Sequence, residues 1–343
     1  MRALRKTQAA AGLELADVPM PEVNSPDDVL VRVTATGICG SDLHVDDWTP
    51  SYAFITQSLP VTIGHEFVGV AQTGPLRGQR VVVRPSVTCG TCPACTSGRH
   101  DACERRTGIG MTRDGAFAPW VRVPTRNCVP VPDGVSDELA ALTEPLSISM
   151  QALRVAGKVA GQRVLVMGPG TIGQGIAVLA RRAGAAQVVV SGRDDAARLD
   201  ALRRMGFDAL VDVADKSLAE STAPYTGGES FDVVFEATGV PETISEALPL
   251  LRRNGIVVIT GIHARPLSLD LTALVRKQQQ LRGSFRPPES DWPQALAMMG
   301  EIGDVLKPMV SHVLPLSQAL DGFALAHGKQ ASKVLLRPED CDG

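Results

Sequence analysis

The sequence predicts a two-domain α/β protein, in which a β-rich first half is followed by a doubly wound parallel sheet. Three observations support this fold class. The chain has 343 residues, enough for two domains of roughly 150 residues each. From Gly161 onward, six apolar runs alternate with helical stretches, as in a parallel sheet covered by helices on both faces. Before Pro132, β-branched runs are separated by turn residues, which indicates short strands and irregular loops.

The expected elements follow in order along the chain. In the first half we expect strands over residues 29–36, 67–71 and 80–84. Ser136 is a candidate N-cap for a short acidic helix, and a second helix is expected over residues 147–156. In the second half the expected strands are residues 163–167, 187–190, 209–211, 231–235, 256–260 and 281–285. The expected helices between them are residues 172–183, 196–205, 217–222, 241–252 and 271–280.

Composition and charge exclude several function classes. Hydrophobic residues make up 44% of the chain and charged residues 21%, which is typical of a globular protein with a core. The net charge of −3 provides no basic field for nucleic acid or an anionic membrane. No apolar stretch approaches the roughly 18–20 residues of a membrane span, and the first residues lack the apolar run of a signal peptide. We therefore expect a cytoplasmic protein without nucleic-acid or membrane partners.

A glycine motif opens the first regular strand–helix unit. Gly168, Gly170 and Gly173 have the GxGxxG spacing, with Thr171 and Ile172 between the last two. The motif follows an apolar strand and opens an amphipathic helix, which is the context of a dinucleotide-binding loop. Glycines there allow a tight turn and a close approach of backbone N–H groups to a pyrophosphate. The alternative is a tight turn that binds no ligand. This alternative is less favoured because regular strand–helix units follow the motif.

Four of the seven cysteines lie within fifteen residues: Cys89, Cys92, Cys95 and Cys103. Thiolates at this spacing on a turn can converge on one tetrahedral ion, and the fourth sulfur closes the site. In a chain without a secretion signal, the pattern favours a metal over disulfides. We expect a structural zinc ion. A zinc ribbon that binds nucleic acid is disfavoured by the acidic chain, whereas an iron–sulfur site stays open as a less favoured alternative.

A second set of possible metal ligands is scattered along the chain. Cys39, His65, Glu66 and Glu144 offer a thiolate, an imidazole and two carboxylates, the ligand types of a catalytic zinc with an open position. A lone histidine is more often a core residue than a ligand, so spacing alone leaves this set undecided.

Taken together, these motifs resemble the zinc-dependent medium-chain alcohol dehydrogenases. The resemblance covers nearly the whole chain in the family's order: residues 37–44 (GICGSDLH), 64–66 (GHE), the four-cysteine segment, residues 115–118 (GAFA) and the glycine motif. Residues 144–147 (EPLS) and 283–286 (GSFR) resemble the sorbitol, or polyol, dehydrogenase branch. The tyrosine that follows the arginine in that branch is Pro287 here.

The resemblance implies a mostly β, GroES-like catalytic domain over residues 1–147 with the tail 288–343, and a Rossmann domain over residues 148–287 inserted between them. It also implies two zinc ions per chain. Cys39, His65 and Glu66 would hold the catalytic ion, with Glu144 either a fourth ligand or bridged to the ion by water.

The same resemblance implies a proton relay. Ser41 would accept the proton of the substrate hydroxyl, and His44 would pass it to solvent. A local turn hydrogen bond is the alternative for Ser41, and an ordinary surface histidine is the alternative for His44.

The implied activity is reversible oxidation of a secondary alcohol by a nicotinamide cofactor, with a polyol or sugar alcohol as the expected substrate. Trp48, Tyr52 and Phe54 fall where the family lines its substrate pocket, with core packing as an equal alternative. Arg286 would contact sugar hydroxyls, unless it forms an ion pair with Glu289. Threonine, butanediol and a cyclitol-like precursor are alternative substrates, and a non-catalytic zinc protein is a further alternative. The family also implies a homo-oligomer, either a dimer or a tetramer.

The choice between NAD and NADP depends on the end of the second expected strand. An NAD-binding fold carries an acid there, about 20 residues beyond the last motif glycine, to accept from the ribose 2′-hydroxyl. That position falls on Gly192, whose missing side chain leaves room for a 2′-phosphate, and Arg193 and Arg198 could supply positive charge. The sequence thus favours NADP. If the strand runs two residues longer, Asp194 or Asp195 becomes the ribose acceptor.

The remaining thiols and histidines lack a motif. Cys128 and Cys341 are interpreted as spare thiols. His100 is interpreted as a bystander, because four thiolates already complete a tetrahedron.

Overall fold

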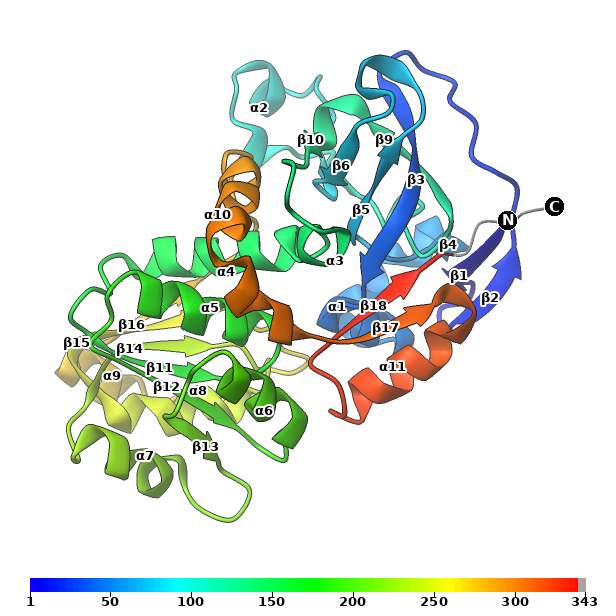
Figure 1. The fold of residues 1–343 in the computed structure, drawn as a ribbon. Helices are drawn as coiled ribbons and strands as arrows, with labels where there is room; N and C mark the ends of the chain where they lie inside the picture. The colour runs from blue at the N-terminus through cyan, green and yellow to red at the C-terminus, as the bar shows by residue number, and fades with distance from the viewer. Residues whose placement is uncertain (339–343) are drawn as a thin grey trace. The chain divides into compact units, whose positions relative to one another are not determined.

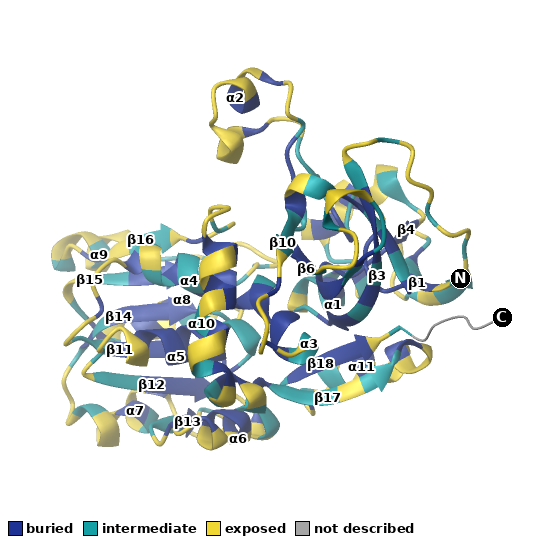
Figure 2. Cartoon of the chain, turned by 45° about the horizontal axis from the view of Figure 1, so that its top comes forward, coloured by how far each residue is buried: buried dark blue, intermediate teal, exposed yellow. Residues whose placement is uncertain are grey.

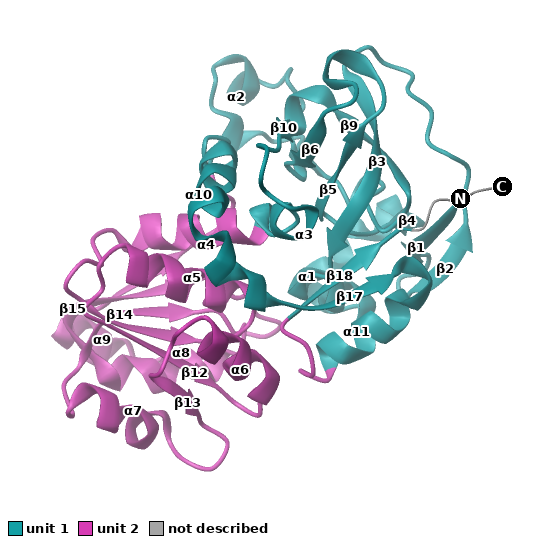
Figure 3. Ribbon diagram, in the orientation of Figure 1, with its two compact units in different colours: residues 1–144, 288–327, 333–343 teal, residues 145–287, 328–332 magenta. Residues whose placement is uncertain are grey.

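The computed structural model describes residues 1–338 and divides the chain into two compact units (Figure 3). Unit 1 consists of Met1–Glu144, Pro288–His327 and the chain from Lys333 onward, and unit 2 consists of Pro145–Pro287 and Gly328–Ser332. The predicted domain boundaries lie after residues 147 and 287. The predicted first domain includes residues 328–332, whereas the structure groups these residues with unit 2. Cys341 lies outside the described residues.

Unit 1 is built on a seven-stranded sheet with the order β10-β6-β5-β3-β18-β17, in which β9 also pairs with β3 (Figure 1). Its strands are β3 (Asp28–Gly37), β5 (Glu66–Ala71), β6 (Arg80–Val83), β9 (Trp120–Pro124), β10 (Cys128–Pro130), β17 (Val310–Pro315) and β18 (Lys333–Arg337). A second sheet contains β1 (Arg2–Lys6), β2 (Glu14–Asp17) and β4 (Val61–Thr62), and β7 (Ser86–Val87) pairs with β8 (Thr107–Gly108). The three strands predicted for this half are confirmed.

Alternating apolar residues give the large sheet its buried face. Val29, Val31 and Val33 are 2% exposed or less along β3, and Phe67 of β5 belongs to the same core cluster. Successive side chains of a strand point to opposite faces, so alternate valines reach one core. Figure 2 shows these strands buried and the connecting loops exposed.

Short helices connect the strands of unit 1. Its helices are α1 (Gly40–Asp46), the 3-10 helix η1 (Pro50–Ser58), α2 (Pro93–Thr96), α3 (Asp137–Ala140), α10 (Asp291–Leu306) and α11 (Ala319–His327). The Ser136 hydroxyl accepts a hydrogen bond from the Leu139 N–H at 3.4 Å, which confirms the predicted N-cap of α3. The next helix, α4 (Thr143–Ala156), begins at the end of unit 1 and continues in unit 2.

Unit 2 is a six-stranded parallel sheet with the order β13-β12-β11-β14-β15-β16, which confirms the predicted doubly wound fold. The strands are β11 (Arg163–Met167), β12 (Gln187–Gly192), β13 (Leu210–Asp212), β14 (Phe231–Glu236), β15 (Leu251–Ile259) and β16 (Gln280–Gly283). The helices are α5 (Thr171–Arg182), α6 (Ala196–Arg204), α7 (Leu218–Thr226), α8 (Pro241–Ala247) and α9 (Leu271–Lys277). The strand order reverses between β11 and β14, where such folds bind ligands.

Several boundaries in unit 2 correct the prediction. The helix expected over residues 217–222 runs to Thr226, and the helix expected over residues 271–280 ends at Lys277, before β16 begins at Gln280. The helix expected over residues 241–252 ends at Ala247, because Pro249 has no N–H to continue it, and β15 begins at Leu251. Strand β12 extends to Gly192, two residues beyond its predicted end, because Ser191 and Gly192 still pair with β13. Among the described residues, no helix is both long and apolar enough to cross a membrane.

Candidate metal centres and nucleotide site

The pairing of β3 with β5 assembles the first candidate metal centre. Gly37 on β3 stands opposite Glu66 at the start of β5, so Cys39, two residues further along, lies beside His65 and Glu66. The ligand atoms of Cys39, His65 and Glu66 all lie within 4.8 Å of one another. A side chain at Gly37 would overlap the Glu66 carboxylate, so the approach of the two strands requires glycine.

A buried carboxylate, Asp42 of α1, supports the histidine of this centre. Oδ1 of Asp42 lies 3.4 Å from Nδ1 of His65, and Oδ2 accepts from the backbone N–H of Cys39 at 2.9 Å. On the other side of the ring, Nε2 of His65 lies 3.2 Å from the Ser41 hydroxyl. Burial opposes protonation of His65, but the charge of Asp42 raises the pKa of His65 well above its ordinary value. A carboxylate behind an imidazole commonly fixes the orientation of a metal ligand.

Two further charged groups, the buried Lys333 and the half-buried Glu144, act on the same centre. Lys333, the first residue of β18, donates from Nζ to Glu66 Oε2 at 2.6 Å and to the Ile38 carbonyl at 2.8 Å. Its side chain is 2% exposed; burial lowers the pKa of Lys333, but the charge of Glu66 gives a net rise. Burial also raises the pKa of Glu144 to about 7, and the charge of His65 acts on this carboxyl. Glu144 therefore lies within electrostatic range of the three clustered ligands.

This donor set fits a zinc ion. One sulfur, one imidazole and one carboxylate are three protein ligands, and catalytic zinc sites keep a fourth position for water or substrate. Burial and the charge of Glu66 raise the pKa of the Cys39 thiol, and a divalent cation is the group that would stabilise its thiolate.

The predicted relay residues lie on α1 beside this centre. Ser41 and His44 are three residues apart and so share a helix face. The His44 ring stacks on Tyr52 with centroids 5.6 Å apart and an interplanar angle of 12°, and its Nδ1 lies 3.4 Å from the Thr49 hydroxyl. Tyr52 is buried, and burial raises the pKa of its hydroxyl. The structure thus brings Ser41, His44 and Tyr52 together.

The other predicted substrate residues have different surroundings. Phe54 is 62% exposed, although its ring centroid lies 5.9 Å from that of Tyr52. Trp48 has a φ of 56°, and Nζ of the buried Lys6 lies 5.2 Å from its ring. Arg286, in unit 2, has a φ of 50° and places its guanidinium 4.6 Å from the Phe285 ring. Their roles toward substrate stay predictions.

The four-cysteine segment forms the second candidate metal centre. The sulfur atoms of Cys89, Cys92, Cys95 and Cys103 all lie within 4.8 Å of one another around α2. Backbone N–H groups point at them: the Cys92 N–H donates to Cys89 Sγ, and the Cys89 N–H donates to Cys103 Sγ, both at 3.3 Å. Such bonds, led by the backbone of Thr91, lower the pKa of Cys89 to about 5. Four thiolates at this separation fit a closed zinc site.

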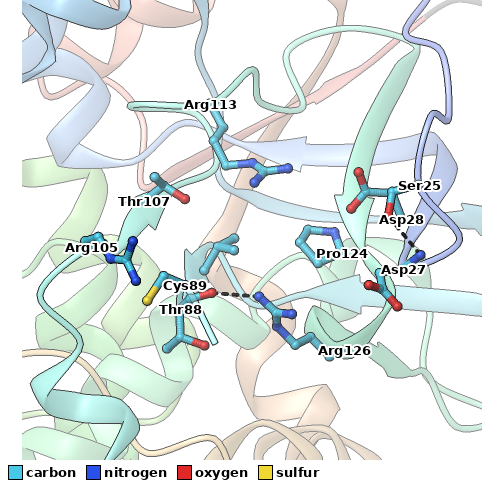
Figure 4. A pocket seen from close by; sticks show the side chains of 11 residues that line it. Ser25, Asp27, Asp28, Thr88, Cys89, Arg105, Thr107, Arg113, Pro124 and Arg126 are labelled. Carbon is cyan, nitrogen blue, oxygen red and sulfur yellow. Dashed lines mark hydrogen bonds between the residues drawn. The ribbon is translucent and has the colours of Figure 1, made fainter. Parts of the chain in front are cut away.

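A cavity of about 360 Å³ opens beside the same segment (Figure 4). Arg105, Arg113 and Arg126 line it together with Asp27 and Asp28. Charges of both signs therefore share this cavity, and it is separate from the predicted relay and nucleotide-binding residues.

The glycine motif has the geometry of a pyrophosphate-binding loop. Helix α5 begins after Gly170, which brings no capping side chain and has open space where a Cβ would stand. Gly168 has a φ of 99°, and a side chain at Gly173 would overlap the Gly168 carbonyl. The first N–H groups of α5 are thus accessible to an anion, which fits a dinucleotide.

The end of β12 differs from its prediction. A Cβ at Gly192 would lie 2.9 Å from the Pro169 ring and 3.0 Å from Cβ of Asp195, so the space beside Gly192 is already occupied. Asp195 is 5% exposed and accepts from Arg198 at 3.0 Å. Arg193 and Asp194 are exposed. Strand β12 thus ends on Gly192, the position where an NAD-binding fold carries its acid, and Asp194 is the exposed acid two residues beyond the strand end.

Comparisons with known proteins match both halves of the chain. Residues 25–133 match a family model described as the alcohol dehydrogenase GroES-like domain, and residues 171–301 match one described as zinc-binding dehydrogenase. An L-threonine 3-dehydrogenase from Chromobacterium violaceum is 33% identical, over 98% of this chain and 99% of its own.

Three solved structures share the fold over nearly their whole length. A candidate zinc-binding dehydrogenase from Sinorhizobium meliloti, bound to NADP, is 31% identical with a TM-score of 0.85, covering 98% of this chain and 99% of that one. A protein from Escherichia coli described as a short chain alcohol dehydrogenase, complexed with NADH, is 27% identical with a TM-score of 0.86 and the same coverage. L-Idonate 5-dehydrogenase from Escherichia coli is 27% identical with a TM-score of 0.85, covering 98% of each chain.

Proposed function

The chain belongs to the zinc-dependent medium-chain alcohol dehydrogenase family, and from that premise we propose that it oxidises a secondary alcohol of a small polyhydroxylated compound with NADP. The observation that carries the proposal is the cluster of the half-buried Cys39 with the buried His65 and Glu66. The Ser41 hydroxyl lies 3.2 Å from His65 Nε2. That arrangement combines a three-ligand cation site with a proton acceptor.

In the proposed reaction, Cys39, His65 and Glu66 would hold the zinc ion. When bound, zinc would supply Lewis-acid chemistry that lowers the pKa of the substrate hydroxyl, and a nicotinamide would supply hydride-transfer chemistry. Ser41 takes the hydroxyl proton, and His44 on the same helix face passes it to solvent. The depressed pKa of His44, caused by burial, keeps its imidazole neutral and able to accept that proton near pH 7.

Three supporting residues keep these groups in place. Asp42 orients His65, and Lys333 holds one oxygen of Glu66, which leaves the other oxygen for the cation. Glu144, whose pKa burial raises above its ordinary value, lies within electrostatic range of the same ligands.

The polyol proposal rests on Arg286, whose planar fork of donors suits vicinal hydroxyls. An ion pair between Arg286 and Glu289 stays the alternative; Glu289 also forms an ion pair with Arg84 and lies 3.6 Å from Nδ1 of His100. We expect Arg286→Ala to raise KM about tenfold for a polyol such as sorbitol, because the substrate would lose hydrogen bonds to a charged group. For 2-propanol we expect KM to rise by less than about twofold. Equal losses on both alcohols would remove the polyol argument.

L-Threonine is the second candidate substrate, because the Chromobacterium violaceum relative of that name is 33% identical over 98% of this chain. A turnover panel decides between them: sorbitol, L-threonine, 2,3-butanediol and 2-propanol, each with NAD and with NADP. Turnover of L-threonine alone would replace the polyol proposal. Zinc binding without turnover of any alcohol would indicate a non-catalytic zinc protein.

NADP is proposed because Arg193 stands exposed at the end of β12, where an adenosine ribose is bound in this fold class. The test is kcat/KM for both cofactors in the native enzyme and in Arg193→Ala. A native preference for NAD of about tenfold or more, unchanged by the substitution, would assign recognition of the ribose to Asp194.

We further propose, from the family alone, that the chain is a cytoplasmic homo-oligomer, either a dimer or a tetramer. Light scattering would distinguish these two states.

A further inference from the structure

The tail contributes a short segment, Gly328–Ser332, to unit 2. Two side chains of unit 2 fasten it. Gln174 of α5 donates to the Ser332 hydroxyl at 2.7 Å, and Arg198 of α6 donates to the Ala331 carbonyl at 3.1 Å. Both helices follow strands whose carboxyl ends form the nucleotide edge of the sheet. The segment therefore lies at the half of that edge which binds adenosine.

Lys329 reaches the end of β12 from this segment. Its backbone has a φ of 54°, and its Nζ donates to the Arg193 carbonyl at 2.7 Å. The same ammonium lies 3.6 Å from Asp195, and the side chain is 42% exposed. A lysine has three N–H donors, so this anchored ammonium keeps donor capacity toward solvent.

The three cations at this edge, Arg193, Arg198 and Lys329, differ in their contacts and exposure. Arg198 is the closer partner of Asp195, at 3.0 Å, and also donates to the Ala331 carbonyl. It is therefore committed to holding the helix start and the returning segment. Arg193 is exposed, and the Lys329 side chain is 42% exposed against 18% for Arg198. Arg193 and Lys329 are therefore the more accessible cations at the strand end, where the 2′-position of an adenosine ribose is bound.

We infer that Lys329, together with Arg193, binds the 2′-phosphate of NADP, and that Arg198 instead positions the segment that carries Lys329. The inference rests on the proposed use of NADP. A phosphate accepts strong charge-assisted hydrogen bonds from a lysine ammonium and an arginine guanidinium, which explains how this edge could select the phosphorylated ribose although Asp194 and Asp195 lie nearby.

The test measures binding of 2′,5′-ADP and 5′-AMP to the full chain by calorimetry. These probes differ only in the 2′-phosphate and need no turnover. The native protein should bind 2′,5′-ADP more tightly than 5′-AMP. Lys329→Ala should weaken 2′,5′-ADP binding about tenfold, because the phosphate would lose a hydrogen bond to a charged group. The same substitution should change 5′-AMP binding by less than about twofold.

Further variants separate charge from positioning. Lys329→Gln can still donate to the Arg193 carbonyl but lacks the charge, so it should lose the phosphate preference, whereas Lys329→Arg should retain most of it. Arg198→Ala should weaken both probes, since it releases the segment. Lys277→Ala, a lysine of α9 in the same unit, is the matched control and should change neither.

The outcomes distinguish the two proposals. A native protein that binds both probes equally would overturn the NADP proposal and this inference with it. A native preference for 2′,5′-ADP that survives in Lys329→Ala and Lys329→Gln would overturn the role of Lys329 alone. Equal weakening of both probes in Lys329→Gln would show that Lys329 only fastens the chain.

Discussion

The two candidate metal centres of unit 1 are assembled in opposite ways. Cys89, Cys92, Cys95 and Cys103 lie within one short segment around α2, and backbone N–H groups surround their sulfur atoms. The other centre gathers Cys39 from one end of β3 and the His65–Glu66 pair from the start of β5. One centre is local in the sequence, whereas the other exists only when two strands pair in the correct register.

Their surroundings differ as well. The four-cysteine centre offers four sulfurs, which complete a tetrahedron and leave no position for substrate. The Cys39 centre offers three ligands and is bordered by the buried charges of Asp42 and Lys333 and by the half-buried Glu144. A metal in the first centre would therefore close a loop, whereas a metal in the second would be held within an existing core.

The largest expected effect comes from removing a ligand of the Cys39 centre. Cys39→Ala should lower kcat at least about thousandfold, because the Lewis acid would lose its thiolate ligand. The fold should persist, since the surrounding strands are held by the core cluster of Val31, Val33 and Phe67. Steady-state kinetics and circular dichroism check both halves, and normal turnover with an intact fold would contradict the assignment.

Removing a ligand from the other centre should instead affect stability. Cys95→Ala opens the lobe between Cys89 and Cys103, so we expect a loss of several kcal/mol in unfolding free energy or a failure of assembly. Denaturant unfolding and light scattering would measure it. Any residual folded protein should keep most of its turnover, and a variant as stable as the native protein would rule out a structural ion there.

A milder change tests the histidine support. Asp42→Asn keeps the side-chain shape but removes the charge that lies 3.4 Å from His65. Outer groups of this kind typically contribute about 10–100-fold to metal affinity. Competition with a zinc chelator should show a weakened site at Cys39, His65 and Glu66, while the affinity of the four-cysteine centre stays unchanged.

A further effect concerns pH. The pKa of Glu144 lies at about 7 in the fold, above the ordinary 4.5, because the carboxyl is buried. A raised pKa means that protonated Glu144 stabilises the metal-free fold, fully below about pH 4 and progressively less as pH rises through 7. We expect metal-free protein to lose up to about 3 kcal/mol between pH 5 and 8, and Glu144→Gln to lose less. Denaturant titrations at each pH would show the difference, and identical pH profiles would contradict it.

The parts of the molecule that sequence could predict are the local ones. Alternating apolar runs predicted the parallel sheet, and short spacing alone indicated the four-cysteine centre. Cys39, His65 and Glu66 needed a family resemblance, because their meeting depends on the register in which Gly37 faces Glu66.

The supporting charges were missed for the same reason. Lys333 lies 295 positions from Ile38, whose carbonyl it contacts, and Lys329 lies 136 positions from Arg193. Asp42 stood within a recognised motif, but its role appears only once α1 places it against His65. The predicted end of β12 falls two residues short of Gly192, because the pairing of Ser191 and Gly192 with β13 is a tertiary effect.

The most direct test of the account is the zinc content of the carefully purified chain, measured by native mass spectrometry for the native protein and for Cys39→Ala. We expect two zinc ions per native chain and one in Cys39→Ala, with the remaining ion in the four-cysteine centre. One zinc ion or none in the native chain, or two in Cys39→Ala, would contradict the assignment of a catalytic zinc to Cys39, His65 and Glu66.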